Sequence, residues 1–148
     1  PLPQVAVAGR RLSPGAIGRR LSAVPERELA SLLANMSPVA DPVDYVFDTA
    51  PHGTAIREDA LMMFRESEAT TFVRPARADD ALPRYRRITM RVHSDLEAVG
   101  FTAAFSRALT DAGVSANVVA AAHHDHVFVP AADVARAMQA LEALSAGG

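Results

Sequence analysis

Residues 88–113, ITMRVHSDLEAVGFTAAFSRALTDAG, decide the fold, because a strand and a helix can both be read from them. Ile88, Met90 and Val92 alternate with polar residues, which is the period of a half-buried strand. After a polar corner, apolar residues recur at helical spacing and form one stripe: Phe101, Ala104, Phe105, Ala108, Leu109 and Ala112. Gly113 stands where a left-handed residue commonly ends a helix. The stretch therefore predicts a strand, a corner and a helix.

Two strands and a closing helix follow this unit. Residues 114–122 and 127–129 are rich in valine and predict strands on either side of a histidine-rich turn. Pro130 ends the second of these strands, and a further apolar stripe predicts a helix over 131–144. The order strand, helix, strand, strand, helix is most of an α+β ferredoxin-like sandwich. We therefore expect an antiparallel sheet within residues 86–129, backed on one face by both helices.

This C-terminal unit, residues 86–144, lacks the fourth strand of such a sandwich. The chain ends in the small, polar sequence SAGG soon after the closing helix. An unpaired sheet edge invites association with other chains. We therefore expect a strand from the N-terminal half, or another copy of the chain in a homo-oligomer, beside this edge.

The N-terminal half is less regular. Residues 26–37 predict a helix, because Leu29, Leu32, Leu33 and Met36 fall at helical spacing. Residues 44–49, 60–65 and 70–74 predict short strands. We accordingly divide the chain into an N-terminal unit over 26–75, a polar, proline-containing linker over 76–85, and the C-terminal unit.

Composition excludes several classes of function. Apolar residues make up 49% and charged residues 22%, as in soluble globular proteins. The absence of cysteine excludes disulfides and thiolate zinc sites. Residues 1–25 carry four arginines and no acid, which we interpret as a flexible leader or an added extension, whereas the remainder has 11 basic and 17 acidic residues, a net charge of −6. This acidic body argues against nucleic-acid binding, and no apolar run is long enough for a membrane helix. We expect a cytoplasmic protein, because the lack of cysteine fits a reducing cytosol.

Several short sequences resemble a bacterial family of small proteins with two tandem ACT-like domains. The C-terminal ones are SDLEAVG (94–100), VSANVV (114–119) and HDHVFVP (124–130), and looser matches reach back to residue 26. The resemblance implies a tandem repeat of two ACT-like βαββαβ units. It also implies regulatory or sensory binding of a small molecule, usually an amino acid, without catalysis and without a cofactor. The N-terminal unit is degenerate, since Ala69 stands where the family has glycine.

The corner at 94–100 is the predicted ligand site. A strand that enters a helix through a glycine presents free backbone N–H groups, which favour an anion such as an α-carboxylate. Asp95 or Glu97 could meet an α-ammonium group, and Asn117 offers both a donor and an acceptor. The resemblance implies that this corner and the next strand line the site, which gives the candidate residues Ser94, Asp95, Leu96, Glu97, Ala98, Val99, Gly100, Asn117 and Val118. In the structural alternative, Gly100 only allows tight packing, Ser94 or Asp95 caps the helix, and Asn117 satisfies a sheet end.

Two other functions stay open. His124, Asp125 and His126 could hold a divalent metal, but a zinc site needs three or four converging ligands and no distant partner is evident in the sequence. The family that the chain resembles carries His-Asp-His at this hairpin, which we interpret as turn chemistry with an Asp–His hydrogen bond. The chain could also be an interaction module that dimerises through its sheet edges and binds no ligand. We expect no enzyme, because the nucleophile, phosphate-binding and zinc-protease motifs are all missing from the sequence.

Overall fold

The computed structural model describes residues 27–147, which fold into a sheet with helices on one side. The predicted leader over 1–25 and the first residue of the predicted N-terminal helix lie outside the described residues. The helices and strands are α1 (Leu29–Asn35), β1 (Pro38–Ala50), β2 (Met62–Arg65), β3 (Thr70–Pro75), β4 (Tyr85–Met90), α2 (Phe101–Asp111), β5 (Asn117–Ala120), β6 (Asp125–Pro130), the 3-10 helix η1 (Ala131–Asp133) and α3 (Val134–Gly147). This content confirms the α+β class.

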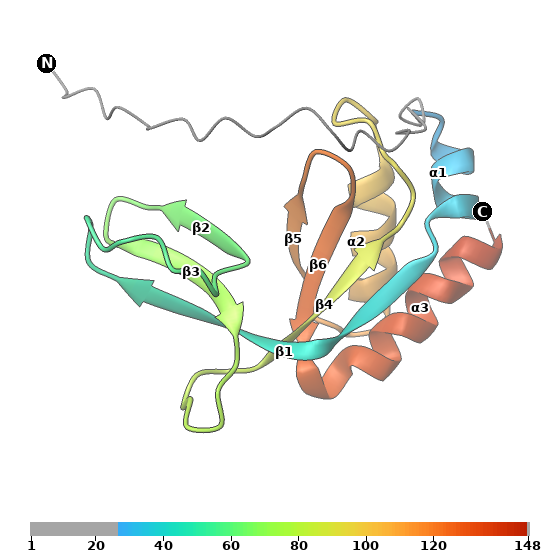
Figure 1. The fold of residues 1–148 in the computed structure, drawn as a ribbon. Helices are drawn as coiled ribbons and strands as arrows, with labels where there is room; N and C mark the ends of the chain where they lie inside the picture. Colours follow the sequence, from blue (N-terminus) through green and yellow to red (C-terminus); the bar gives the residue numbers. More distant parts are fainter. Residues whose placement is uncertain (1–26, 148) are drawn as a thin grey trace, which may run out of the picture.

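All neighbouring strands of the six-stranded sheet pair antiparallel, in the order β2-β3-β1-β4-β6-β5. Figure 1 shows the three α-helices gathered on one side of the sheet, while β2, β3 and the end of β1 project away from them. The two helices after the predicted corner cover the same face, as expected.

The missing fourth strand of the C-terminal unit is supplied by β1. Residues 38–40 of β1 pair antiparallel with residues 88–90 of β4. The order β1-β4-β6-β5 then completes a four-stranded ferredoxin-like sheet within a single chain. The prediction that the N-terminal half provides this strand is confirmed.

The predicted strand over 44–49 is too short, since β1 runs from Pro38 to Ala50. The first part of the strand contains two prolines and two aspartates, so its sequence does not show the alternating pattern that predicts a strand. The register with β4 shifts between Ala40 and Asp44, so Pro42 lies in a bulge. A bulge tolerates proline, because a residue there need not donate a ladder hydrogen bond.

Helix α1 packs with the C-terminal unit, although it precedes all the strands. It is shorter than the predicted helix over 26–37, because Ser37 adopts a φ of 40° and turns the chain into β1. Leu32 and Met36 are fully buried in the same core cluster as Ile88 and Phe105. Both α1 and β1 lie in the predicted N-terminal unit, yet α1 packs in the core of the C-terminal unit and β1 pairs with its sheet.

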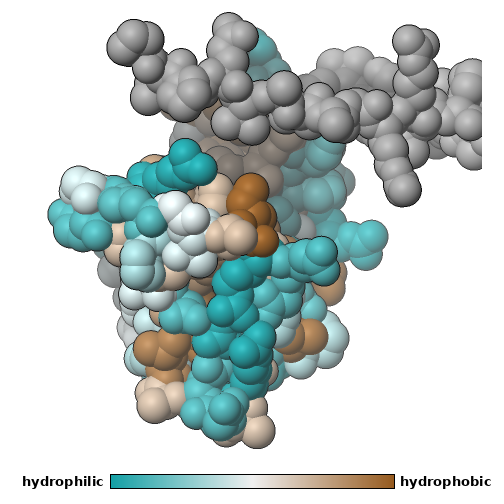
Figure 2. Space-filling model, turned by 60° about the vertical axis from the view of Figure 1, so that its left-hand side comes forward, coloured by the Kyte–Doolittle hydropathy of each residue, from teal (hydrophilic) through white to brown (hydrophobic). Residues whose placement is uncertain are grey.

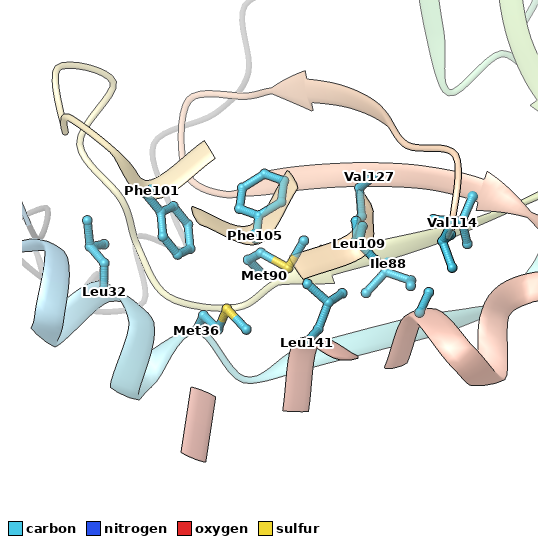
Figure 3. Close-up of a cluster of buried hydrophobic side chains, with 12 residues drawn as sticks. Leu32, Met36, Ile88, Met90, Phe101, Phe105, Leu109, Val114, Val127 and Leu141 are labelled. Atoms are coloured by element: carbon cyan, nitrogen blue, oxygen red, sulfur yellow. The ribbon is translucent and has the colours of Figure 1, made fainter. Parts of the chain in front are cut away.

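The main hydrophobic core lies between the sheet and the helices (Figure 3). Phe101, Phe105 and Leu109 of α2 point into it and are almost completely buried. The rings of Phe101 and Phe105 meet edge to face with centroids 5.4 Å apart. Leu141 of α3 lies in the same cluster. The helical stripe that the sequence predicted therefore faces the core.

The end of α2 explains why the next strand is shorter than predicted. Gly113 has a φ of 67° and donates to Thr110 O, while Val114 N donates to Leu109 O. These two bonds form a Schellman motif. Val114 is thereby used to close the helix, and β5 begins only at Asn117 instead of at Val114.

The surface is mixed in character. Figure 2 shows hydrophobic patches separated by hydrophilic side chains on the face from which β2 and β3 project. Ile56, Phe64, Leu96 and Val99 are the most exposed large apolar residues described. Within residues 27–147, no helix is both long and apolar enough to cross a membrane.

Candidate functional site

The corner between β4 and α2 is tied to β6 by a buried hydrogen bond. Ser94 Oγ donates to Asp125 Oδ2 over 2.8 Å, and both residues are buried. Asp125 is the first residue of β6, so this bond fixes the corner against the sheet. The sequence indicated Asp125 either as the partner of a histidine in the turn or as a metal ligand. In the structure its carboxylate bonds to Ser94 instead and positions that residue.

Asp95 and Glu97 are bridged by one arginine. Arg27 Nε donates to Asp95 Oδ2 over 2.7 Å, and Arg27 Nη2 donates to Glu97 Oε2 over 2.8 Å. Asp95 Oδ1 also accepts the backbone N–H of Glu97 over 2.8 Å. This N–H bond, followed by the bond from Arg27, holds the pKa of Asp95 below its usual value. Asp95 is therefore an anion with a cation already beside it.

Gly100 allows the sharp entry into α2. Its φ of 94° is in the left-handed region, where a Cβ is strained. A Cβ at this position would also lie 3.2 Å from Leu29 Cδ2. Gly100 is the N-cap residue, and no side chain hydrogen-bonds to the cap. The alternative prediction that Ser94 or Asp95 caps the helix is wrong, because Ser94 bonds to β6 and Asp95 to the turn.

A recess of about 60 Å³ opens at this corner. Its lining residues come from the corner, the first turn of α2 and the facing strand ends: Ser94, Asp95, Leu96, Ala98, Phe101, Thr102, Ala120 and Asp125. A cavity of roughly 10–15 Å³ is enough to hold one water molecule. The recess thus has room for a few water molecules or one small polar group.

Asn117 and Val118 lie apart from this recess. β4 and β5 each pair antiparallel with β6 and therefore run parallel to one another. The end of β5, at Ala120, consequently reaches the corner, whereas Asn117 starts the strand at the far end. Asn117 Nδ2 donates to Phe128 O over 3.4 Å, and Val118 packs against the core. The structure thus brings the corner residues together with Ala120, Phe101 and Thr102, which sequence patterns alone could not indicate.

The histidines do not converge with Asp125. His126 Nδ1 lies 2.9 Å from Thr89 Oγ1, and His124 Nδ1 lies 3.1 Å from Val92 O, whereas Asp125 bonds to Ser94. His123 Nδ1 instead approaches His93 Nε2 at 3.5 Å. Among residues 27–147, no group of three or more histidine, aspartate or glutamate side chains could hold a metal ion. The metal alternative therefore has no support from the described residues.

His126 should make stability depend on pH. Burial, followed by the charge of Arg87, lowers the pKa of His126 below its usual value. The unfolded chain therefore binds a proton more readily, so stability is full above about pH 6.5 and is lost as the pH falls through the folded pKa. We expect the urea midpoint to drop between pH 7.5 and 5.5, and to drop less in His126→Gln. His52→Gln, in the exposed 51–61 loop, is the control, and an equal slope in His126→Gln would contradict the expectation.

Two family models, each described as an ACT domain, match the chain in tandem. One matches residues 24–87 and the other residues 83–143. The second range contains the corner and the recess, and the first ends within β4. The comparison with curated proteins found no match.

Solved structures are similar over most of the chain. A Vibrio cholerae protein of unknown function, described as a possible transport protein, is 39% identical, with a TM-score of 0.65 over 75% of this chain and 91% of that one. An Agobacterium tumefaciens protein is 15% identical, with a TM-score of 0.58 over 70% and 84% of the two chains. The aspartokinase alpha and beta subunits are 11% identical, with a TM-score of 0.54 over 72% and 95%. The last two similarities concern the fold alone.

Proposed function

This chain belongs to the ACT-domain family, and from that premise we propose that it binds an amino acid at the corner formed by Ser94–Gly100. ACT domains are generally regulatory modules that bind small molecules, often amino acids. We further propose that the protein acts as a sensor and catalyses no reaction.

One observation carries the choice of ligand: the recess combines acceptors and donors that suit a zwitterion. Asp95 and Asp125 line it and offer carboxylates to an ammonium group. Phe101 and Thr102 of the uncapped first turn of α2 also line it, and free N–H groups at a helix N-terminus favour a carboxylate. A simple anion would be repelled by the two aspartates, and a simple cation would leave the helix end unused.

Arg27 sets a condition on binding. Its guanidinium already bonds to Asp95 and Glu97. A ligand ammonium group that reaches Asp95 must share this carboxylate with Arg27 or displace it. The Arg27 side chain is 61% exposed, so solvent screens its ion pairs and this competition costs a ligand little.

A thermal-shift screen against the common amino acids tests the proposal. A ligand at about 100 times its Kd should stabilise the fold by ~2.7 kcal/mol. In Asp95→Asn most of this shift should disappear, because the amide has no charge for the ammonium group. The unliganded variant should stay within ~1 kcal/mol of the parent, since the amide oxygen can still accept the N–H of Glu97.

Asp111→Asn is the matched control, because Asp111 is an exposed acid at the other end of α2. It should respond to the ligand as the parent does. A parent protein that no amino acid stabilises would contradict the proposal. In that case a concentration-dependent oligomer would favour the dimerising interaction module.

A further inference from the structure

A second concave site lies on the face of the sheet that the helices leave uncovered. Ile88 and Met90 of β4 point into the helix-covered core, so the alternating residues Arg87, Thr89 and Arg91 face the other way. A groove of about 270 Å³ is lined by these three residues, by the β1 bulge and by His124. It is larger than the recess at the corner and shares no lining residue with it.

The bulge in β1 fixes Arg87 at this groove. Asp41 Oδ2 accepts Arg87 Nη2 over 2.6 Å, Arg87 Nε over 3.1 Å and Tyr45 Oη over 2.7 Å. The guanidinium carbon also lies 5.7 Å from the centroid of the Tyr45 ring. Burial acts to raise the pKa of Asp41, but the hydrogen bonds from Tyr45 and Arg87 outweigh it and the pKa lies below its usual value. Arg87 is thus held rigidly by an ionised partner.

Arg91 adds a positive charge that Asp41 does not balance. Its backbone N–H donates to Met36 O over 2.7 Å, which anchors the residue between α1 and β4. Its exposed side chain lines the groove and forms no ion pair or hydrogen bond within residues 27–147. Two arginines therefore face one aspartate here, on a body whose residues 26–148 carry a net charge of −6. Such a local excess of positive charge attracts anions.

An apolar hollow adjoins the groove. It measures about 190 Å³, and Arg87 lines it as well. Leu61, Met62, Val119 and Phe128 form much of its wall. Binding sites for small molecules are typically apolar with a few well-placed polar groups, and the two hollows together have this character.

We propose that this face binds a small organic anion, whose carboxylate or phosphate group lies between Arg87 and Arg91 and whose apolar part occupies the adjoining hollow. The proposal is independent of the amino-acid site. Arg87 supplies a fixed donor, Arg91 supplies one without a side-chain partner among residues 27–147, and the neighbouring side chains exclude water from the apolar part.

The fluorescent dye 8-anilinonaphthalene-1-sulfonate is a suitable first probe, because it combines an anionic group with aromatic rings and the chain has no tryptophan. The folded protein should bind it saturably. Arg91→Gln should raise the Kd of the dye at least tenfold, since hydrogen bonds to charged groups are among the stronger ones. Arg107→Gln, an equally simple change of an exposed arginine on α2, should leave the Kd unchanged.

Competition identifies the kind of anion. Displacement of the dye by octanoate would identify a carboxylate with an apolar tail, and displacement by inorganic phosphate would identify a phosphate group. Asp95→Asn should bind the dye as the parent does, which separates this site from the corner. Absence of saturable binding in the parent, or equal Kd values in the parent and Arg91→Gln, would overturn the proposal.

Discussion

We expect replacement of Phe105 by alanine to lower the free energy of unfolding by ~3–5 kcal/mol, the usual cost of deleting a buried aromatic ring. Phe105 has no exposed surface and lies at the centre of the α2 stripe. Its ring packs edge to face on Phe101 and shares the core with Met90 and Leu141 (Figure 3). These neighbours come from different elements, so the site cannot collapse easily around the cavity.

Urea denaturation at pH 7.5 measures this loss. The control is Arg107→Ala on the opposite, exposed face of α2, where the side chain forms an i,i+4 ion pair with Asp111. It should cost about 0.5 kcal/mol or less. Equal losses in the two variants would mean that the buried face of α2 contributes no more than its surface.

The parts of the fold that were correctly predicted are those specified by short stretches of sequence. The stripe over 101–112 fixes the buried face of α2, because helical side chains three and four residues apart share one side. Gly113 ends that helix in a left-handed conformation, as expected. Such signals need no knowledge of distant partners.

The length of β1 could not be predicted, because it depends on contacts distant in the sequence. Pro42 argues against a strand until its place in a bulge opposite β4 is known. The prediction that Asn117 lies beside the corner did not anticipate its position at the far end of β5, for a similar reason. The direction of β5 relative to the corner follows from the pairing with β6, and this pairing is a property of the whole sheet.

The candidate site was predictable only in part. The corner and its glycine turn were predicted from the sequence, and Gly100 adopts there the left-handed conformation that glycine permits. The bonds from Arg27 to Asp95 and from Ser94 to Asp125 join residues 68 and 31 positions apart. The groove at Arg87 and Arg91 was not predicted at all. Strand alternation indicates which residues share a face of the sheet, but it does not indicate that a bulge in β1 makes this face concave.

Replacement of Arg74 should also lower the stability of the fold strongly. Its side chain is 6% exposed, and it donates to Asp80 through two nitrogens at 2.7 and 2.8 Å and to Asp48 at 2.9 Å. These bonds, led by those to Asp80, raise the pKa of Arg74, and the bonds from Arg74 lower the pKa of Asp80. The cluster ties β3 to β1 and to the 76–84 loop.

We therefore expect Arg74→Met to lower the Tm by roughly 5–10 °C at pH 7, because removing one partner of a buried ion pair leaves the other charge uncompensated. Arg107→Met, which breaks an exposed pair, should change the Tm by about 1 °C or less.

The depressed pKa of Asp80 gives stability that is present above pH 4 and is lost as the pH falls through its folded pKa. The difference in Tm between the parent and Arg74→Met should accordingly shrink below about pH 4, where Asp80 in the variant becomes protonated. A deficit that is independent of pH would show that Arg74 stabilises the fold by packing and not through its charge.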